Sequence, residues 1–168
     1  MDYLWTPWRY TYVSRSDDAN RGAEGCVFCR VLAAGVADRE SLIVHRGTRN
    51  FVMLNRFPYT SGHMMVVPYA HVATLSEALP AALAEMMRLT RQVERLLRAL
   101  YQPDGINIGM NIGRAAGAGV DGHIHMHALP RWFADSNFAT VIGETRVLPE
   151  ELSLTWERAR DAFLRASA

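Results

Sequence analysis

The segment His123-Ile124-His125-Met126-His127 holds three of the six histidines of this 168-residue chain, at alternate positions. In a β-strand, successive side chains point to opposite faces of the sheet. A strand here would place the three imidazoles on one face, with Ile124 and Met126 on the other. The pattern therefore predicts a row of nitrogen nucleophiles and proton donors on one face of a strand whose other face is apolar.

Other parts of the chain predict the elements around this segment. Short apolar runs between turn signals favour strands, and apolar residues at a period near 3.6 favour helices. The predicted strands cover 42–45, 51–55, 63–67, 106–111 and 123–127. The predicted helices cover 27–35, 80–101 and 149–165. Successive strands joined by tight turns, with one long helix and a C-terminal helix, predict an α+β fold around a five-stranded antiparallel sheet.

The composition excludes several classes of protein. The net charge is +1, so no overall field favours a nucleic acid or a membrane as partner. All 18 basic residues are arginines, which excludes a Schiff-base lysine and a P-loop lysine. No run approaches the roughly 20 apolar residues of a membrane span, and the N-terminus lacks the order of a signal peptide. We therefore expect a cytoplasmic protein with no nucleic-acid or membrane partner.

The length favours one domain with added terminal segments. Residues 1–21, which include Trp5 and Trp8, are predicted to form an aromatic arm on the domain or on a partner subunit. Residues 22–140 would form the domain itself, and residues 141–168 a C-terminal helical extension.

Three histidines at alternate positions of a straight strand cannot all bind one metal ion. Alternate strand residues lie roughly 6.6 Å apart, whereas ligand nitrogens lie about 2 Å from zinc. The stronger interpretation is nucleophilic catalysis, in which a neutral imidazole attacks phosphorus and a neighbour protonates or hydrogen-bonds the leaving oxygen. His125, with a histidine on each side, is the favoured nucleophile. A three-histidine metal centre and a chance alternation of core histidines are the alternatives.

Two further features bear on the chemistry. The loop from Gly113 to Gly122 is glycine-rich and could turn several N–H groups toward a phosphate, although such a loop is also a common plain turn. Cys26 and Cys29 have the spacing of half a zinc site. A redox pair and two unrelated buried thiols remain as alternatives for the cysteines. His45 is expected to be an ordinary strand residue.

With these motifs the chain resembles the histidine triad superfamily of nucleotide hydrolases and transferases. The resemblance covers residues 22–140 and rests on His123 to Leu129 and on the block from Asn55 to Pro68. Pro130-Arg131-Trp132 and the segment from Trp5 to Arg9 are similar to the branch that contains diadenosine polyphosphate phosphorylases. Gly117-Ala118-Gly119-Val120 stands where many hydrolases have Gly-Gln-Ser/Thr, which also favours the phosphorylase branch.

The resemblance implies roles for individual residues. His125 would take the nucleotidyl group, His127 would contact the scissile phosphate and its bridging oxygen, and His63 would complete the catalytic group. Asn55 would bind the ribose. The α-phosphate would be held by Asn111, Gly117, Ala118 and Gly119, and Arg131 would bind the acceptor phosphate or the polyphosphate tail.

The resemblance also implies a cofactor, an activity and a partner. Cys26, Cys29, His71 and His123 would hold a structural zinc ion, and magnesium could accompany the substrate. The expected activity is nucleotidyl transfer through a histidine intermediate, cleaving Ap4A-like dinucleoside polyphosphates with phosphate or water as acceptor. A nucleoside phosphoramidate hydrolase and a slow-turnover nucleotide-binding regulatory protein are the alternatives. A homodimer in which two sheets join is expected.

Overall fold

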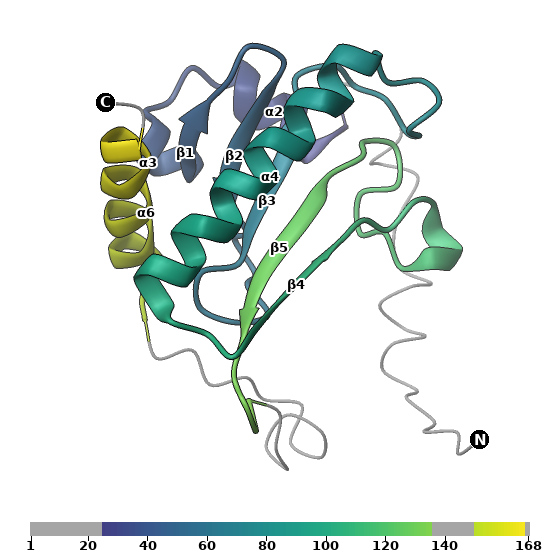
Figure 1. The fold of residues 1–168 in the computed structure, drawn as a ribbon. Helices are drawn as coiled ribbons and strands as arrows, with labels where there is room; N and C mark the ends of the chain where they lie inside the picture. The colour runs from purple at the N-terminus through teal and green to yellow at the C-terminus, as the bar shows by residue number, and fades with distance from the viewer. Residues whose placement is uncertain (1–24, 136–149, 167–168) are drawn as a thin grey trace, which may run out of the picture.

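A computed structural model of the chain describes residues 25–135 and 150–166, so the predicted aromatic arm lies outside the described residues. Five antiparallel strands form one sheet in the order β1-β2-β3-β5-β4 (Figure 1). The strands are β1 (Ile43–Arg46), β2 (Asn50–Leu54), β3 (Met64–Pro68), β4 (Gly105–Gly109) and β5 (Met126–Arg131). The predicted α+β fold with a five-stranded antiparallel sheet is confirmed.

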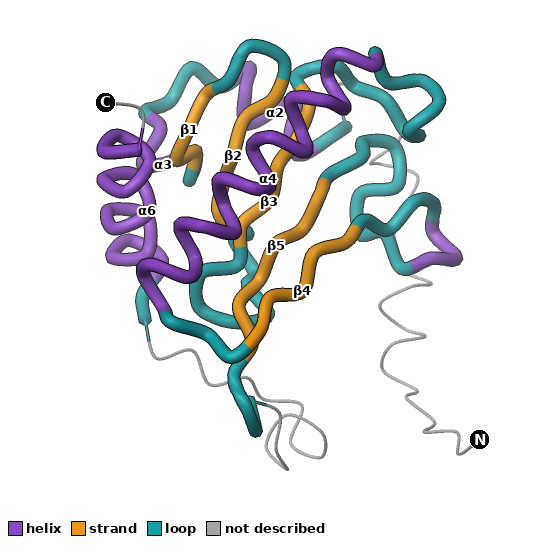
Figure 2. Tube along the Cα trace, in the orientation of Figure 1, coloured by secondary structure: helices purple, strands orange, loops and turns teal. Residues whose placement is uncertain are grey.

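Helices pack around this sheet, and the long helix α4 runs diagonally across it (Figure 2). The helices are α2 (Val27–Ala33), α3 (Asp38–Ser41), α4 (Pro80–Tyr101) and α6 (Leu152–Ala166), with a 3₁₀ turn, η2 (Arg114–Ala116). Pro80 occupies the first turn of α4, where a backbone N–H has no acceptor within the helix, so the missing N–H of proline costs no hydrogen bond. The sequence pattern did not predict α3. Within the residues that the structure describes, no helix is both long and apolar enough to cross a membrane.

Alternation along the central strands builds a separate core on each face of the sheet. Val52 and Leu54 of β2 pack in the cluster that includes the buried face of α4. Phe51 and Met53 point the other way, into a second cluster with Phe28 of α2. All five residues are buried, so the sheet is covered on both faces at its centre.

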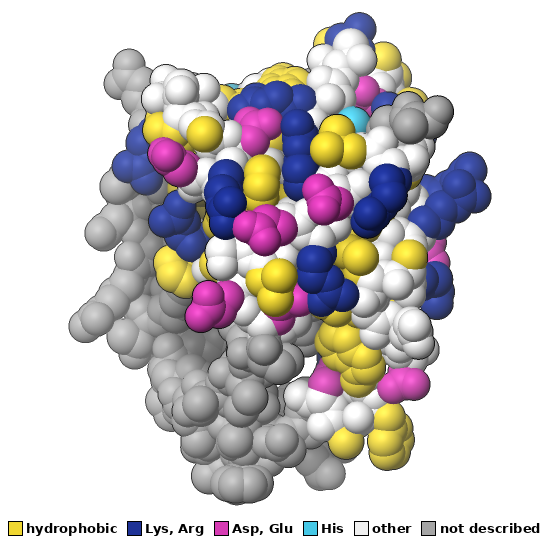
Figure 3. All heavy atoms as spheres, turned by 90° about the vertical axis from the view of Figure 1, so that its left-hand side faces the viewer, with side chains coloured by type: hydrophobic (Ala, Val, Ile, Leu, Met, Phe, Trp, Pro, Cys, Tyr) yellow, Lys and Arg dark blue, Asp and Glu magenta, His cyan; other side chains and the backbone are white. Residues whose placement is uncertain are grey.

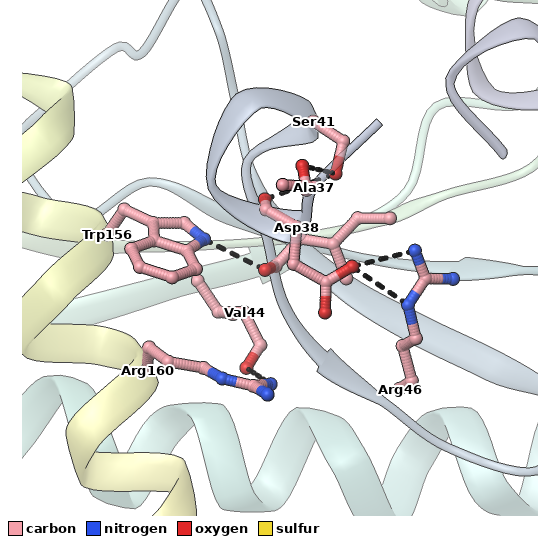
Figure 4. A network of polar contacts seen from close by, with 8 residues as sticks. Ala37, Asp38, Ser41, Val44, Arg46, Trp156 and Arg160 are labelled. Carbon is pink, nitrogen blue, oxygen red and sulfur yellow. Dashed lines mark hydrogen bonds and ion pairs between the residues drawn. The ribbon is translucent and has the colours of Figure 1, made fainter. Parts of the chain in front are cut away.

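Helix α6 covers the β1 edge of the sheet, as Figure 4 shows. The Nε1–H of Trp156 donates to the carbonyl of Ile43 over 2.8 Å, and Nη1 of Arg160 donates to the carbonyl of Val44 over 2.9 Å. Unpaired strand edges invite pairing with other chains, and these two bonds occupy carbonyl groups of the edge strand.

The histidine segment is only partly a strand, which corrects the prediction for 123–127. The ladder of β5 begins at Met126, which lies opposite Val66 of β3. Continuing that register would place Ile124 opposite Pro68, which has no N–H to donate. The N–H of Ile124 bonds instead to the carbonyl of Val72 over 2.8 Å. The side chains still alternate, since Ile124 and Met126 pack in the α4 cluster.

Candidate active site and metal centre

Two thiols and two imidazoles meet where α2 approaches the segment before β5. The Sγ of Cys26 lies 3.3 Å from Nδ1 of His123. The Sγ of Cys29 lies 3.5 Å from Nδ1 of His71 and 3.7 Å from Nδ1 of His123. The two Nδ1 atoms are 3.3 Å apart. The structure thus brings together the four residues predicted as metal ligands.

These distances fit one tetrahedral zinc ion. Zinc–sulfur bonds of about 2.3 Å and zinc–nitrogen bonds of about 2.0–2.1 Å give tetrahedral edges of about 3.6 Å between S and N and about 3.4 Å between two N atoms. The observed edges are 3.3–3.7 Å and 3.3 Å. Two cysteines and two histidines form a closed ligand set, which is typical of a structural site.

The tautomer of His123 also suits a metal ion. Nε2 of His123 lies 2.9 Å from the carbonyl oxygen of Pro68 and must donate to it, so Nδ1 presents its lone pair to the cluster. Burial lowers the pKa of His123 to about 4, which keeps the ring neutral at pH 7. Burial, with the neighbouring Cys26, raises the pKa of Cys29 to about 11. Both a redox nucleophile and a metal ligand are thiolates, so a bound metal ion would have to displace the proton of Cys29.

His125 lies directly beyond this cluster and is fixed in one tautomer. Its Nδ1 lies 2.9 Å from the carbonyl oxygen of His123, so Nδ1 carries the proton and Nε2 keeps its lone pair. The side chain is only 4% exposed, and its ring centroid lies 5.1 Å from that of Phe28. Burial lowers the pKa of His125, which favours the neutral ring. A neutral imidazole with an available Nε2 lone pair is a competent nucleophile.

His127 is fixed in the opposite tautomer by a short hydrogen-bond chain. The backbone N–H of Tyr59 donates to Nδ1 of His63 over 3.2 Å, so the proton of His63 is on Nε2. Nε2 of His63 then donates to Nδ1 of His127 over 2.9 Å, which leaves the proton of His127 on its own Nε2. Burial, with His125 nearby, lowers the pKa of His127 to about 4, so this ring is neutral at pH 7.

The two neighbouring rings therefore offer complementary groups. The centroids of His125 and His127 are 4.7 Å apart, in an edge-to-face arrangement. His125 presents an acceptor nitrogen and His127 presents an N–H donor. A nucleophile beside a hydrogen-bond donor is the pairing that displacement at a phosphorus centre needs.

Asn55 and Asn111, which are predicted to bind the nucleotide, lie near these histidines. The Oδ1 of Asn55 accepts the N–H of Phe57 over 3.0 Å, and its Nδ2 lies 3.4 Å from Nδ1 of His63. Asn111 follows β4, and its Nδ2 lies 3.5 Å from the carbonyl of Gly117 in the glycine-rich loop. Asn111 follows the end of β4 at which Gly109 pairs with His127. Asn55 thus contacts His63 of the predicted catalytic group, and the predicted phosphate loop begins at the same end of β5.

Arg131 lies at the other end of β5. It pairs with Gly105 in the ladder, whereas His127 pairs with Gly109. Its guanidinium donates to both carboxylate oxygens of Asp135 over 2.5 and 2.7 Å and to the side chain of Asn107 over 2.8 Å. The structure does not bring Arg131 together with the histidines.

The comparison of this sequence with known families agrees with this geometry. The sequence model described as "HIT domain" matches residues 37–134, which include His63, His71 and the three histidines of the row. This chain belongs to the HIT family. Cys26 and Cys29 precede the matched range, so the four predicted metal ligands come from both the HIT domain and the segment before it.

Relatives refine the placement within the HIT family. The AP-4-A phosphorylase of Mycobacterium tuberculosis is 37% identical over 156 residues, which cover 90% of this chain and 79% of that protein. This match confirms the prediction of a HIT-family enzyme resembling the Ap4A phosphorylases.

Solved structures confirm the fold. A zinc-bound histidine triad family protein from Mycobacterium smegmatis superposes with a TM-score of 0.69 at 26% identity, over 87% of this chain and 98% of that one. A hypothetical histidine triad nucleotide-binding protein from Sulfolobus tokodaii gives a TM-score of 0.68 at 25% identity, over 84% and 94%.

Three contacts at the HIT site were not predicted from the sequence. They are the ring of Phe28 against His125, the N–H of Tyr59 on His63, and the carbonyl of Pro68 on His123. Two of them involve backbone groups, whose contacts cannot be predicted from the residue type. Phe28 lies inside the Cys26–Cys29 motif, and its apolar character was the only available signal.

Proposed function

We propose that this chain is a nucleotidyl-transfer enzyme that cleaves Ap4A-like dinucleoside polyphosphates through a covalent histidine intermediate. The observation that carries the proposal is the pair of opposite tautomers at His125 and His127, side by side. The name of the M. tuberculosis relative supports the substrate class and favours phosphate over water as acceptor.

The proposed reaction has two steps. In the first, the Nε2 lone pair of His125 forms a bond to the α-phosphorus while the bond from that phosphorus to the bridging oxygen breaks. The resulting nucleotidyl-imidazolium keeps its Nδ1–H, which donates to the carbonyl of His123 and so stabilises the positive charge. The Nε2–H of His127 hydrogen-bonds the leaving oxygen, and a polyphosphate, being a weak base, can leave without a full proton transfer.

In the second step, phosphate or water attacks the same phosphorus and the bond to His125 breaks. Phosphate gives a nucleoside diphosphate, so Ap4A would yield ATP and ADP. Water would yield ATP and AMP. We propose that Asn111 and the backbone from Gly117 to Gly119 hold the α-phosphate through both steps, and that any magnesium enters with the substrate.

The metal cluster has a supporting role in this proposal. A zinc ion bound by Cys26, Cys29, His71 and His123 would supply structural rigidity. It would tie α2 to the segment before β5 and so fix the backbone of His123, whose carbonyl sets the tautomer of His125. His125 itself stays outside the ligand set.

We also propose that the protein is a homodimer. Strand β4 ends the sheet in the order of described strands, and Ile108 on it is 44% exposed. An edge strand that carries an exposed apolar residue suits pairing with a second copy. Sedimentation equilibrium tests this, and a monomer at micromolar concentration would contradict it.

The function is tested with Ap4A labelled at the α-phosphate, with and without inorganic phosphate. We expect ATP and ADP when phosphate is present, and a labelled protein adduct after an alkaline quench, which preserves a P–N bond. His125→Ala should form no adduct, whereas Met87→Ala, an exposed change on α4, should behave as wild type.

Other outcomes of this experiment identify the alternatives. Binding of Ap4A with no turnover in either condition would identify the regulatory module. Turnover of adenosine 5′-phosphoramidate, with Ap4A left intact, would identify the phosphoramidate hydrolase.

A further inference from the structure

A groove of about 970 Å³ lies between α4 and α6, lined by two helices that contribute no acidic residue to it. Its charged lining residues are Arg88, Arg91 and Arg95 of α4 and Arg165 of α6, with His45 of β1 beside them. Figure 3 looks at the left-hand side of Figure 1, on which α6 lies, and arginines are spread over this face with acidic side chains between them. The groove is therefore more basic than the face around it.

The arginines of the groove are arranged in a row. Arg88, Arg91 and Arg95 are three and four residues apart, a spacing that places them on one side of α4. The row from Arg88 to Arg95 spans about 10 Å along the helix axis. Arg165 faces the row from α6 across the groove.

Most of these guanidiniums have no acidic partner. Among residues 25–135 and 150–166, no ion pair joins Arg91, Arg95 or Arg165 to a carboxylate. Arg88 has only a long contact of 3.4 Å with Glu85. By contrast Arg98, one turn further along α4, is paired with Glu94 at 2.9 Å. Unpaired like charges in one groove repel, and an anion between them relieves that repulsion.

His45 of β1 lines the groove beside the arginines. The ring of His45 stacks on the ring of Phe163 with centroids 4.9 Å apart and an interplanar angle of 14°. Burial, and then the charges of Arg160 and Arg88, lower the pKa of His45, and the charge of Glu85 opposes them. The balance favours the neutral ring of His45, which lines the groove.

We propose that the α4–α6 groove is a second ligand site, which binds an oligophosphate chain of three or more phosphates. A single phosphate could reach one or two guanidiniums of a row about 10 Å long, whereas an extended polyanion can contact all of them. Guanidinium groups bind phosphate oxygens in bidentate fashion, which suits arginine at each position.

This site is separate from the histidine site. Arg88, Arg91 and Arg95 lie on α4, which packs on one face of the sheet, whereas His125 contacts α2 on the other. The proposal therefore stands whether or not the histidines catalyse nucleotidyl transfer.

Calorimetric titration with sodium tripolyphosphate tests the proposal, with ATP and orthophosphate as further probes. We expect tripolyphosphate to bind in a salt-dependent manner, and orthophosphate to bind at least tenfold more weakly. The double variant Arg91→Gln, Arg95→Gln should weaken tripolyphosphate binding at least tenfold, while His125→Ala should retain it. Only binding that the double variant loses reports on the groove. Within that part, equal affinities for ATP and tripolyphosphate would identify a free phosphate chain as the ligand, and tighter binding of ATP would identify a nucleotide tail.

The matched control is Arg98→Gln, which removes an arginine of the same helix that is not part of the groove lining. It should bind tripolyphosphate as wild type does. The proposal is wrong if the double variant, folded by circular dichroism, keeps wild-type affinity, or if orthophosphate binds as tightly as tripolyphosphate. Preference for a polynucleotide over tripolyphosphate at equal phosphate concentration would also overturn it.

Discussion

The ring centroid of Phe28 lies 5.1 Å from that of His125 and 5.3 Å from that of His123, so one side chain of α2 contacts both the proposed nucleophile and a predicted metal ligand. Phe28→Leu keeps an apolar group there but removes the ring. We expect a stability cost below about 1.5 kcal/mol. Because small displacements of a nucleophile are costly, we expect kcat to fall about tenfold or more, with KM little changed.

Steady-state kinetics with Ap4A check this prediction, with Val27→Leu as the control, since Val27 lies on the same helix and is 37% exposed. Unchanged kcat in a folded Phe28→Leu protein would show that the contact does not position His125.

Patterns within short segments predicted most of the fold, whereas the family resemblance predicted that His63 and His71 join the clusters. The spacing of Cys26 and Cys29 and the alternation around His125 are local signals, and the structure bears out the side-chain alternation. The end of the β5 ladder could not be predicted, because it depends on the register between β3 and β5, which would bring Ile124 opposite Pro68 if the ladder continued beyond Met126. The position of Arg131 was likewise decided by its partners, since Asp135 and Asn107 hold its guanidinium.

The same limit applies to the tautomers of the catalytic group. Sequence alone placed His63, His125 and His127 together through a family resemblance, but it could not assign their protons. Those are set by the N–H of Tyr59 and the carbonyl of His123, both backbone groups. The difference between the proposed nucleophile and the proposed donor therefore depends on contacts that exist only in the folded chain.

The N–H donor on His127 predicts a dependence on the leaving group. His127→Ala should slow formation of the adduct by about 10²–10⁴-fold, because the leaving oxygen loses its hydrogen bond. With a series of aryl esters of AMP, the plot of log kcat against the pKa of the leaving phenol should become steeper in the variant. Parallel plots for variant and wild type would contradict the assigned role of His127.

The metal cluster predicts a loss of stability without zinc. Cys26 is fully buried, and Cys26→Ser should reduce bound zinc well below one ion per chain and lower the melting temperature. His125→Ala should keep its zinc, whereas a three-histidine metal centre would require that it lose the ion. Zinc analysis and thermal unfolding with and without chelator measure both effects. A wild-type protein that binds no zinc on addition would disprove the cluster as a zinc site.

Glu85 of α4 holds the turn between β1 and β2 in place. Its carboxylate accepts the N–H of Thr48 over 2.9 Å, the N–H of Arg49 over 2.7 Å and the side-chain amide of Asn50 over 2.9 Å. Burial alone would raise the pKa of Glu85, but these hydrogen bonds outweigh it and hold the pKa below its ordinary value. The folded state therefore favours the charged carboxylate.

A carboxyl group whose pKa is lower in the folded than in the unfolded state stabilises the fold above its unfolded pKa, and that contribution is lost as the pH falls through its folded pKa. Glu85→Gln should cost about 1–3 kcal/mol at pH 7, because hydrogen bonds to a charged acceptor are lost. The difference from wild type should shrink between about pH 5 and pH 3. Urea unfolding at both ends of this range measures the difference. The control is Glu94→Gln, which breaks a partly exposed ion pair with Arg98 on the same helix and should change stability by less than about 0.5 kcal/mol. A difference that stays constant with pH would show that the charge of Glu85 does not stabilise this turn.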